Sequence, residues 1–148
     1  MGPVTALRSF FGRYFDVYGR SRRFEYFWIT FIQVAGFIFG TILVALSSGS
    51  PEGFESGDLN LFSMSILAIM ALWSVATIIP WITLQIRRFH DMGYTGWMVA
   101  LFVGLLFIPV IGFIGQIVQF FWLLLGSGTA GLNQYGQDPR FSAAGTFA

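Results

Sequence analysis

Residues 86–97 read Ile-Arg-Arg-Phe-His-Asp-Met-Gly-Tyr-Thr-Gly-Trp and lie between two long apolar runs of the sequence. This stretch holds two of the eight basic residues, an aspartate and the only histidine of the chain. Charged side chains next to apolar helices are costly unless they pair or reach water. The stretch therefore marks the end of one predicted membrane helix and the first place to look for function.

The composition is typical of a membrane protein. Of 148 residues, 55% are hydrophobic and 10% are charged, whereas soluble domains carry about 25% charged residues. The mean hydropathy is +0.71, and a chain this short cannot bury so much apolar surface in its own core. We therefore expect lipid to cover much of it. The net charge of +1 argues against nucleic-acid binding, and the lack of cysteine excludes disulfides and thiolate metal sites.

Two uncharged runs are long enough to cross a membrane. They predict helices over 26–46 and 61–86, because about 20 apolar residues at 1.5 Å each span a hydrocarbon core of about 30 Å. Arginines precede the first run and follow the second, and the loop between the two runs carries only acidic charges. By the positive-inside rule, the N-terminus and residues 87–96 are predicted to be cytoplasmic.

The next apolar run, residues 97–125, is ambiguous. A single helix of this length would measure about 43 Å, and Pro109 followed by Gly112 in its middle is typical of a turn. We predict two short membrane-embedded helices, 96–108 and 111–125, that form a hairpin and return the chain to the cytoplasm. The alternative is one kinked span with the C-terminus outside.

The two ends of the chain are predicted to lie at the cytoplasmic surface. Residues 4–18 place apolar side chains on one helical face and arginines on the other, which is typical of an interfacial helix; alternatively this helix packs on the protein's own helices. Residues 126–148 form a polar, glycine-rich cytoplasmic tail without a predicted helix. The prediction is a single all-α integral membrane domain over 1–148, with an amphipathic N-terminal helix and four membrane-embedded helices.

Three segments resemble a bacterial inner-membrane family known as domain of unknown function 805, the YhaH-type proteins. Residues 19–28 read Gly-Arg-Ser-Arg-Arg-Phe-Glu-Tyr-Phe-Trp, residues 87–97 carry the central stretch, and residues 128–139 read Gly-Thr-Ala-Gly-Leu-Asn-Gln-Tyr-Gly-Gln-Asp-Pro. Thr95 before Gly-Trp, and Phe27 between Tyr26 and Trp28, are mild departures from the family pattern. The resemblance implies a helical protein of the bacterial inner membrane with no established activity.

In the predicted topology, the polar segments before the first span, after the second and after the hairpin meet on one cytoplasmic face. The function predicted for this face is binding of an anionic lipid head group, a small anion or a membrane partner, because the planar guanidinium group suits oxyanions. The alternative is structural: the arginines anchor the topology, and Asp91 caps the next helix or pairs with Arg88. Glu25 is predicted to pair with Arg88 or Arg22. The candidate ligand-binding residues are Arg20, Arg22, Arg23, Glu25, Arg87, Arg88, His90, Asp91, Asn133, Tyr135 and Asp138.

Other functions have weaker support in the sequence. Gln116 and Gln119 lie three residues apart and could line a solute path in a homo-oligomer, but no charged residue lies mid-span to relay an ion. His90 is the one side chain suited to a proton relay, although a structural hydrogen bond explains it as well. We expect no enzyme, because no nucleophile has an adjacent base and no cofactor motif is present. No metal site or cofactor is predicted.

Overall fold

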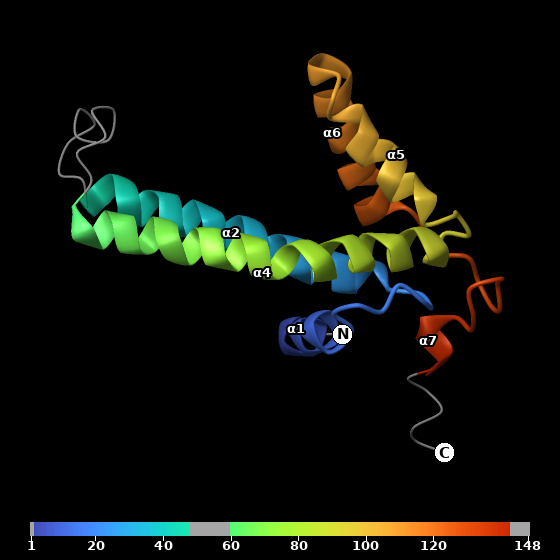
Figure 1. Ribbon diagram of the computed structural model, residues 1–148. Coiled ribbons are helices and arrows are strands. Elements are labelled where there is room, and N and C mark those ends of the chain that lie inside the picture. Colours follow the sequence, from blue (N-terminus) through green and yellow to red (C-terminus); the bar gives the residue numbers. More distant parts are fainter. Residues whose placement is uncertain (1, 48–59, 143–148) are drawn as a thin grey trace. The chain divides into compact units, whose positions relative to one another are not determined.

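The computed structural model describes residues 2–47 and 60–142, and every element named in these ranges is a helix (Figure 1). The prediction of an all-α protein is therefore confirmed for this part of the chain. The chain divides into two compact units: unit 1 comprises Met1–Ile29 with Ile79–Ala148, and unit 2 comprises Thr30–Ile78. The predicted loop between the spans lies mostly outside the described residues, and the single-domain prediction stays a prediction.

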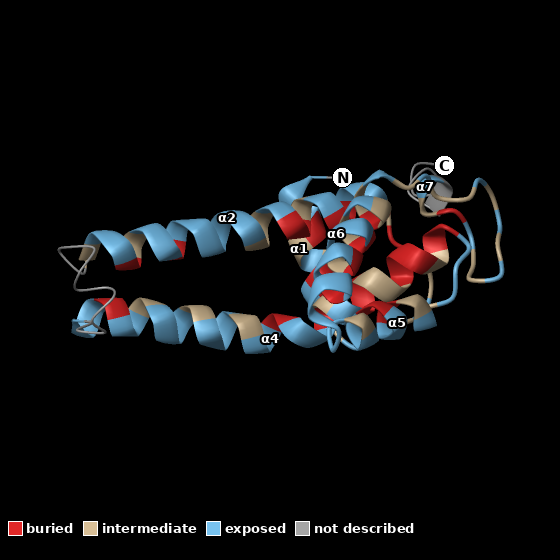
Figure 2. Ribbon diagram, turned by 90° about the horizontal axis from the view of Figure 1, so that it is seen from above, coloured by how far each residue is buried: buried red, intermediate tan, exposed pale blue. Residues whose placement is uncertain are grey.

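Two helices are long and apolar enough to cross a membrane: α2 (Arg23–Ser47) and α4 (Leu61–Asp91). Only 22% and 11% of their most apolar windows are buried, whereas the core helix of a soluble protein is apolar because it is buried. In Figure 2, most residues of the α2 and α4 segments that belong to unit 2 are coloured as exposed. These apolar surfaces require another apolar surrounding, which a bilayer provides.

Within unit 2, α2 and α4 are joined by a few polar and close contacts. Trp73 donates its indole N–H to Gln33 Oε1 at 2.9 Å. A Cβ built on Gly40 would lie 2.6 Å from the sulfur of Met70, whereas a Cβ on Gly36 would meet nothing within 4 Å. Of these two glycines, spaced four apart, only Gly40 marks a close helix contact.

Helix α4 does not end at residue 86 as predicted but continues to Asp91. It ends in a Schellman motif: Gly93 takes a positive φ of 83°, its N–H bonds the His90 carbonyl at 3.1 Å, and the Tyr94 N–H bonds the Phe89 carbonyl at 2.9 Å. The glycine, rather than the pair of arginines, ends the helix. The charged residues of the central stretch consequently lie on the last turns of α4.

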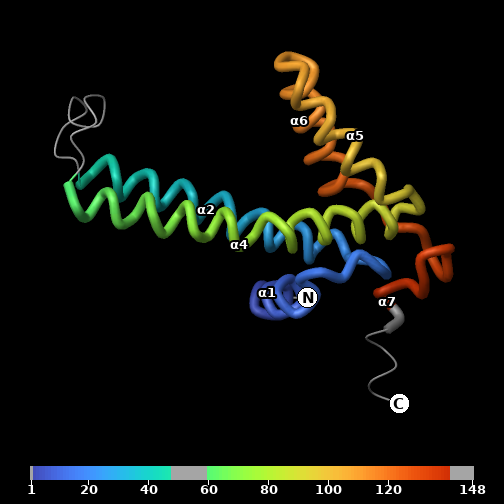
Figure 3. The backbone as a smooth tube through the Cα atoms, viewed as in Figure 1, coloured from blue at the N-terminus to red at the C-terminus, as the bar shows by residue number. Residues whose placement is uncertain are grey.

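Helices α5 (Trp97–Leu105) and α6 (Pro109–Leu125) pack as a hairpin, with a short turn at residues 106–108 (Figure 3). Pro109 occupies the first turn of α6, where its missing N–H costs no helical bond. The predicted ranges 96–108 and 111–125 therefore overran the first helix and began the second too late. The contact is closest at Gly112, where a Cβ would overlap the carbonyl oxygen of Leu105 and lie 2.8 Å from Cα of Leu106.

Helix α1 (Pro3–Gly12) is shorter than the predicted 4–18. The chain turns after Gly12. The carboxylate of Asp16 accepts a hydrogen bond from the backbone N–H of Tyr18 at 2.9 Å, and such a local bond replaces a backbone hydrogen bond that a helix would form. The helix packs on the rest of unit 1 through Ala6 and Phe10. The predicted apolar face consisted of other residues: Val4, Leu7, Phe11, Tyr14, Phe15 and Tyr18. Packing on the protein's own helices is thus present on one face, and interfacial placement stays a prediction for the other.

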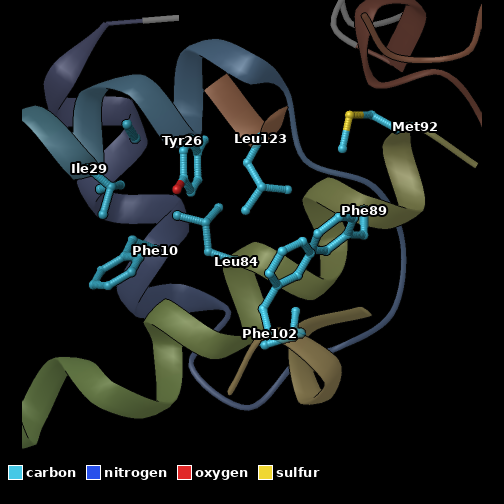
Figure 4. Packing of buried hydrophobic residues seen from close by; sticks show 10 residues of the cluster. Phe10, Tyr26, Ile29, Leu84, Phe89, Met92, Phe102 and Leu123 are labelled. Carbon is cyan, nitrogen blue, oxygen red and sulfur yellow. The ribbon is translucent and has the colours of Figure 1, made fainter. Parts of the chain in front are cut away.

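The core of unit 1 draws on every helix from α1 to α6 that enters this unit (Figure 4). Four of its ten buried residues are aromatic, and among these the ring centroids of Phe89 and Phe102 lie 6.3 Å apart. After α6 the tail forms turns and a short helix, α7 (Pro139–Ser142), that the sequence did not predict. The buried hydrophobic residues of this core are Ala6, Phe10, Tyr26, Ile29, Leu84, Phe89, Met92, Val99, Phe102 and Leu123.

The hairpin contact gives a first prediction. We expect Gly112→Ala to lower the free energy of unfolding by about 1–3 kcal/mol, because backbone atoms of α5 cannot move aside for the new methyl group. The measurement is SDS-titration unfolding followed by tryptophan fluorescence. Gly104→Ala, where a Cβ meets nothing within 4 Å, is the matched control and should not destabilise. Equal stability of the two variants would contradict the close contact.

Candidate functional site

The carboxylate of Asp91, in the last turn of α4, lies between two buried arginines. Its Oδ1 accepts a hydrogen bond from Nε of Arg20, at a distance of 3.0 Å. Its Oδ2 accepts one from a terminal guanidinium nitrogen of Arg88, at 2.5 Å. Arg88 is fully buried, and Arg20 and Asp91 are each 5% exposed. Each buried charge thus has an opposite charge in contact, as burial requires. We call Arg20, Arg88 and Asp91 the Asp91 cluster.

The two arginines of this cluster also bind backbone carbonyls. Arg88 donates to the carbonyls of Leu123 at 2.9 Å and of Gly126, at the C-terminal end of α6, where carbonyls have no partner within the helix. Arg20 donates to carbonyls of the tail, those of Thr129 and, at 2.6 Å, Gly131. The cluster therefore ties the segment before α2, the end of α4, the end of α6 and the tail together.

The tail follows the end of α4 closely. The N–H of Thr129 bonds the Asp91 carbonyl at 2.8 Å, and the Asn133 amide donates to the carbonyl of His90 at 3.0 Å. A Cβ on Gly128 would overlap the Asp91 carboxylate, so only glycine allows this approach. The ring of Tyr135 stacks on His90 with centroids 3.8 Å apart and planes 3° from parallel. Asn133 and Tyr135 thus hold the tail rather than project from it.

Glu25 and Arg87 form a separate, looser pair beneath α1. The nearest nitrogen of Arg87 lies 3.9 Å from Glu25 Oε1, which also accepts the hydroxyl of Ser9 at 2.8 Å. The prediction that Glu25 pairs with Arg88 or Arg22 is therefore wrong, because Arg88 points to Asp91 and Arg22 to the carbonyl of Pro139. Within the described residues, the terminal nitrogens of Arg87 have no hydrogen-bond partner.

A small polar pocket of about 230 Å³ lies between the start of α2 and the tail. Asp138 forms part of its wall and binds Arg140 at 2.7 Å. This hydrogen-bonded guanidinium lowers the pKa of Asp138 below its ordinary value, so the carboxylate stays ionised through the neutral and mildly acidic range. We call the cavity the basic pocket; it is lined by Arg22, Arg23, Phe24, Arg88, Asp91, Ser127, Gly128, Asp138, Pro139 and Arg140.

The eleven residues predicted from the sequence thus fall into four groups. Three form the Asp91 cluster, and His90 lies beside it with Asn133 and Tyr135. Arg22, Arg23 and Asp138 line the basic pocket, while Glu25 and Arg87 form their own pair. The sequence prediction missed Ser9, Gly128, Thr129 and Arg140. Of these, only Arg140 could have been found from the sequence, because it follows Asp138 by two residues and can pair with it.

The glutamines of the hairpin bind within the protein. Gln119 donates its amide to Gln85 Oε1 at 2.7 Å, and Gln116 donates to the carbonyl of Phe102 at 2.8 Å. Such bonds between helices stabilise packing inside a membrane. They account for these side chains without a solute path, and the transport alternative stays a prediction.

The Asp91 cluster gives a second prediction. We expect Asp91→Asn to lower the free energy of unfolding by about 3–5 kcal/mol, because two buried guanidinium groups would lose their counter-charge. Asp16→Asn is the control: its pair with Arg13, at 3.8 Å, is about half exposed, so its loss should cost about 0–1 kcal/mol. Both are measured by SDS-titration unfolding. A similar small loss for both variants would show that the cluster does not stabilise the fold.

Comparison with known proteins supports a membrane protein. A family model, described as protein of unknown function (DUF805), matches residues 14–137. The chain is 34% identical over 126 residues to the inner membrane protein YhaI of Escherichia coli (strain K12), covering 84% of this chain and 86% of that protein. It is 28% identical over 127 residues to the inner membrane protein YhaH of the same organism, covering 82% and 85%. No solved structure matches.

Proposed function

This chain belongs to the DUF805 family of inner-membrane proteins of unknown function, and we propose that it binds a phosphate-bearing lipid head group in the basic pocket. The observation that carries the proposal is that the basic pocket is lined by two arginines without an acidic partner in the described residues. Each acidic residue in the described ranges has an arginine within 4 Å. Arg22 and Arg23 have no acidic partner there, and both line the basic pocket.

The rest of the pocket wall leaves this charge available. Arg88 is paired with Asp91, and Arg140 is paired with Asp138. Arg23 is exposed, with its guanidinium 5.3 Å from the ring centre of Phe24. A guanidinium group can donate two parallel hydrogen bonds to one phosphate, which makes arginine the residue suited to this ligand.

The size of the pocket restricts the ligand. Its volume of about 230 Å³ is below the range of about 300–1,000 Å³ that holds a drug-sized molecule. It therefore suits the phosphate of a head group, with acyl chains left outside. Free phosphate has the same chemistry, and the experiment must separate the two sources.

We expect Arg23→Gln to reduce retention of phosphatidylglycerol about tenfold, because one charge-assisted contact is lost. The measurement is native mass spectrometry of the full chain released from nanodiscs containing phosphatidylglycerol and phosphatidylcholine. Arg8→Gln removes the same charge from an exposed position on α1 that does not line the pocket. It should leave retention unchanged.

Two results would overturn the proposal. One is equal retention in wild type, Arg23→Gln and Arg8→Gln; the other is equal loss in both variants, which would indicate only the effect of net charge. A separate titration with inorganic phosphate distinguishes the sources: saturable binding that displaces the lipid would assign the pocket to free phosphate.

The proposed function includes a membrane topology. α2 and α4 each cross the bilayer, and the hairpin of α5 and α6 enters from the cytoplasmic side and returns. At about 14 Å and 26 Å, neither hairpin helix alone spans a core of about 30 Å. A cytoplasmic N-terminus is supported by the arginines just before and at the start of α2, which are Arg20, Arg22 and Arg23, and by those at the end of α4, which are Arg87 and Arg88.

The chain has no cysteine, so single introduced thiols can test this topology. We expect Ser56→Cys, between the two spans, to react with a membrane-impermeant maleimide in cells with a permeabilised outer membrane. Ser127→Cys, an exposed position after α6, should react only after the inner membrane is opened. Labelling of Ser127→Cys before opening would place the tail outside and contradict the hairpin topology.

A further inference from the structure

A second, larger cavity in unit 1 has the opposite chemistry to the basic pocket. It is a groove of about 610 Å³ between the end of α4, the start of α5 and the segment before α2. None of its lining residues is an arginine, aspartate or glutamate. We call it the α4–α5 groove; Ile82, Ile86, His90, Ala100, Val103 and Tyr135 are the lining residues that matter for its chemistry.

His90 is the polar group with a defined role in this groove. Its Nδ1 lies 3.3 Å from the carbonyl oxygen of Gly19. A carbonyl can only accept, so Nδ1 carries the proton in this bond, and Nε2 of the neutral ring is an acceptor. The stack on Tyr135 fixes the plane of the ring.

The acceptor nitrogen faces the side of the groove where Gly96 lies. A Cβ built on Gly96, which also lines the groove, would lie 3.2 Å from Nε2. No hydrogen bond from another described residue reaches Nε2. The groove thus offers an acceptor nitrogen beside a long apolar wall, and the hydroxyl groups of Tyr18, Thr95 and Tyr135 also belong to its lining.

We propose that the α4–α5 groove binds an uncharged lipid alcohol, whose hydroxyl donates to His90 Nε2 and whose hydrocarbon lies along α4 and α5. A phospholipid head group would bring a negative charge to walls that contain no cation. A quinone has no proton to donate to Nε2, so it would leave this acceptor without a partner and would bind only through donors of the lining such as Thr95. Diacylglycerols and polyprenols both have the required hydroxyl, and a protein in the inner membrane can meet either.

The first test fills the groove. Val103→Trp places a large ring on a lining position of α5. Leu101→Trp makes a comparable change at another exposed position of the same helix, outside the lining. Binding of photoreactive dioleoylglycerol and of a photoreactive polyprenol is measured on the full chain in nanodiscs. We expect Val103→Trp to reduce crosslinking of the preferred probe at least tenfold and Leu101→Trp to leave it unchanged. The probe that crosslinks more strongly identifies the source.

The second test isolates the hydroxyl bond. His90→Phe keeps a ring for the stack but removes the acceptor, and acetylation of the probe's hydroxyl removes the donor. Either change should weaken binding about fivefold, and the two together should weaken it no further. Full affinity of the acetylated probe, or equal crosslinking in Val103→Trp and Leu101→Trp, would overturn the proposal. Preferential crosslinking of phosphatidylglycerol in the groove would also overturn it. Arg23 does not line the groove, so these results are independent of the basic pocket.

Discussion

Unit 1 depends on the carboxylate of Asp91, which is the counter-charge of two buried guanidinium groups. One carboxylate meets two guanidinium groups in an apolar surrounding, and one of them, Arg20, is 71 residues away in the chain. A buried unpaired charge costs several kcal/mol, so neither arginine can be buried unless the carboxylate is in place. The same arginines bind carbonyls of α6 and the tail. The positions of several helix ends therefore depend on the one carboxylate that allows these arginines to be buried.

The contrast with Glu25 and Arg87 shows where the unit is less tightly held. Arg87 is fully buried, yet its closest carboxylate oxygen is 3.9 Å away. Within the described residues, neither its terminal nitrogens nor the hydroxyl of Ser21 has a hydrogen-bond partner. An ion pair at this distance lacks the direct hydrogen bonds that offset desolvation. Glu25 therefore ties α1 to the unit mainly through Ser9, and α1 is held more by Ala6 and Phe10 than by charge.

Local features of the sequence were sufficient for the helices but not for their ends or their contacts. Uncharged runs and the Pro109 turn predicted α2, α4 and the hairpin. The spacing of three placed Arg88 and Asp91 on one side of the helix, and their pair was one of the two roles predicted for Asp91. The end of α4 was misplaced because the capping glycine outweighs two arginines, and α1 was overextended past Gly12. Contacts such as Arg20 with Asp91, or Glu25 with Arg87, depend on how the helices pack against one another. The periodicity of the sequence does not predict that packing.

The last turns of α4 explain why one short stretch serves surfaces of opposite chemistry. Successive residues of a helix differ in direction by about 100°, so neighbours in sequence point to different surroundings. Ile86 and His90, four apart, face the α4–α5 groove, while Arg88 and Asp91, three apart, face the basic pocket. Arg87 points between these two directions, toward Glu25. A one-residue deletion just before Ile86 would therefore bring the guanidinium group of Arg87 to the apolar groove and the apolar ring of Phe89 to the Asp91 cluster, so the order of these residues constrains both surfaces at once.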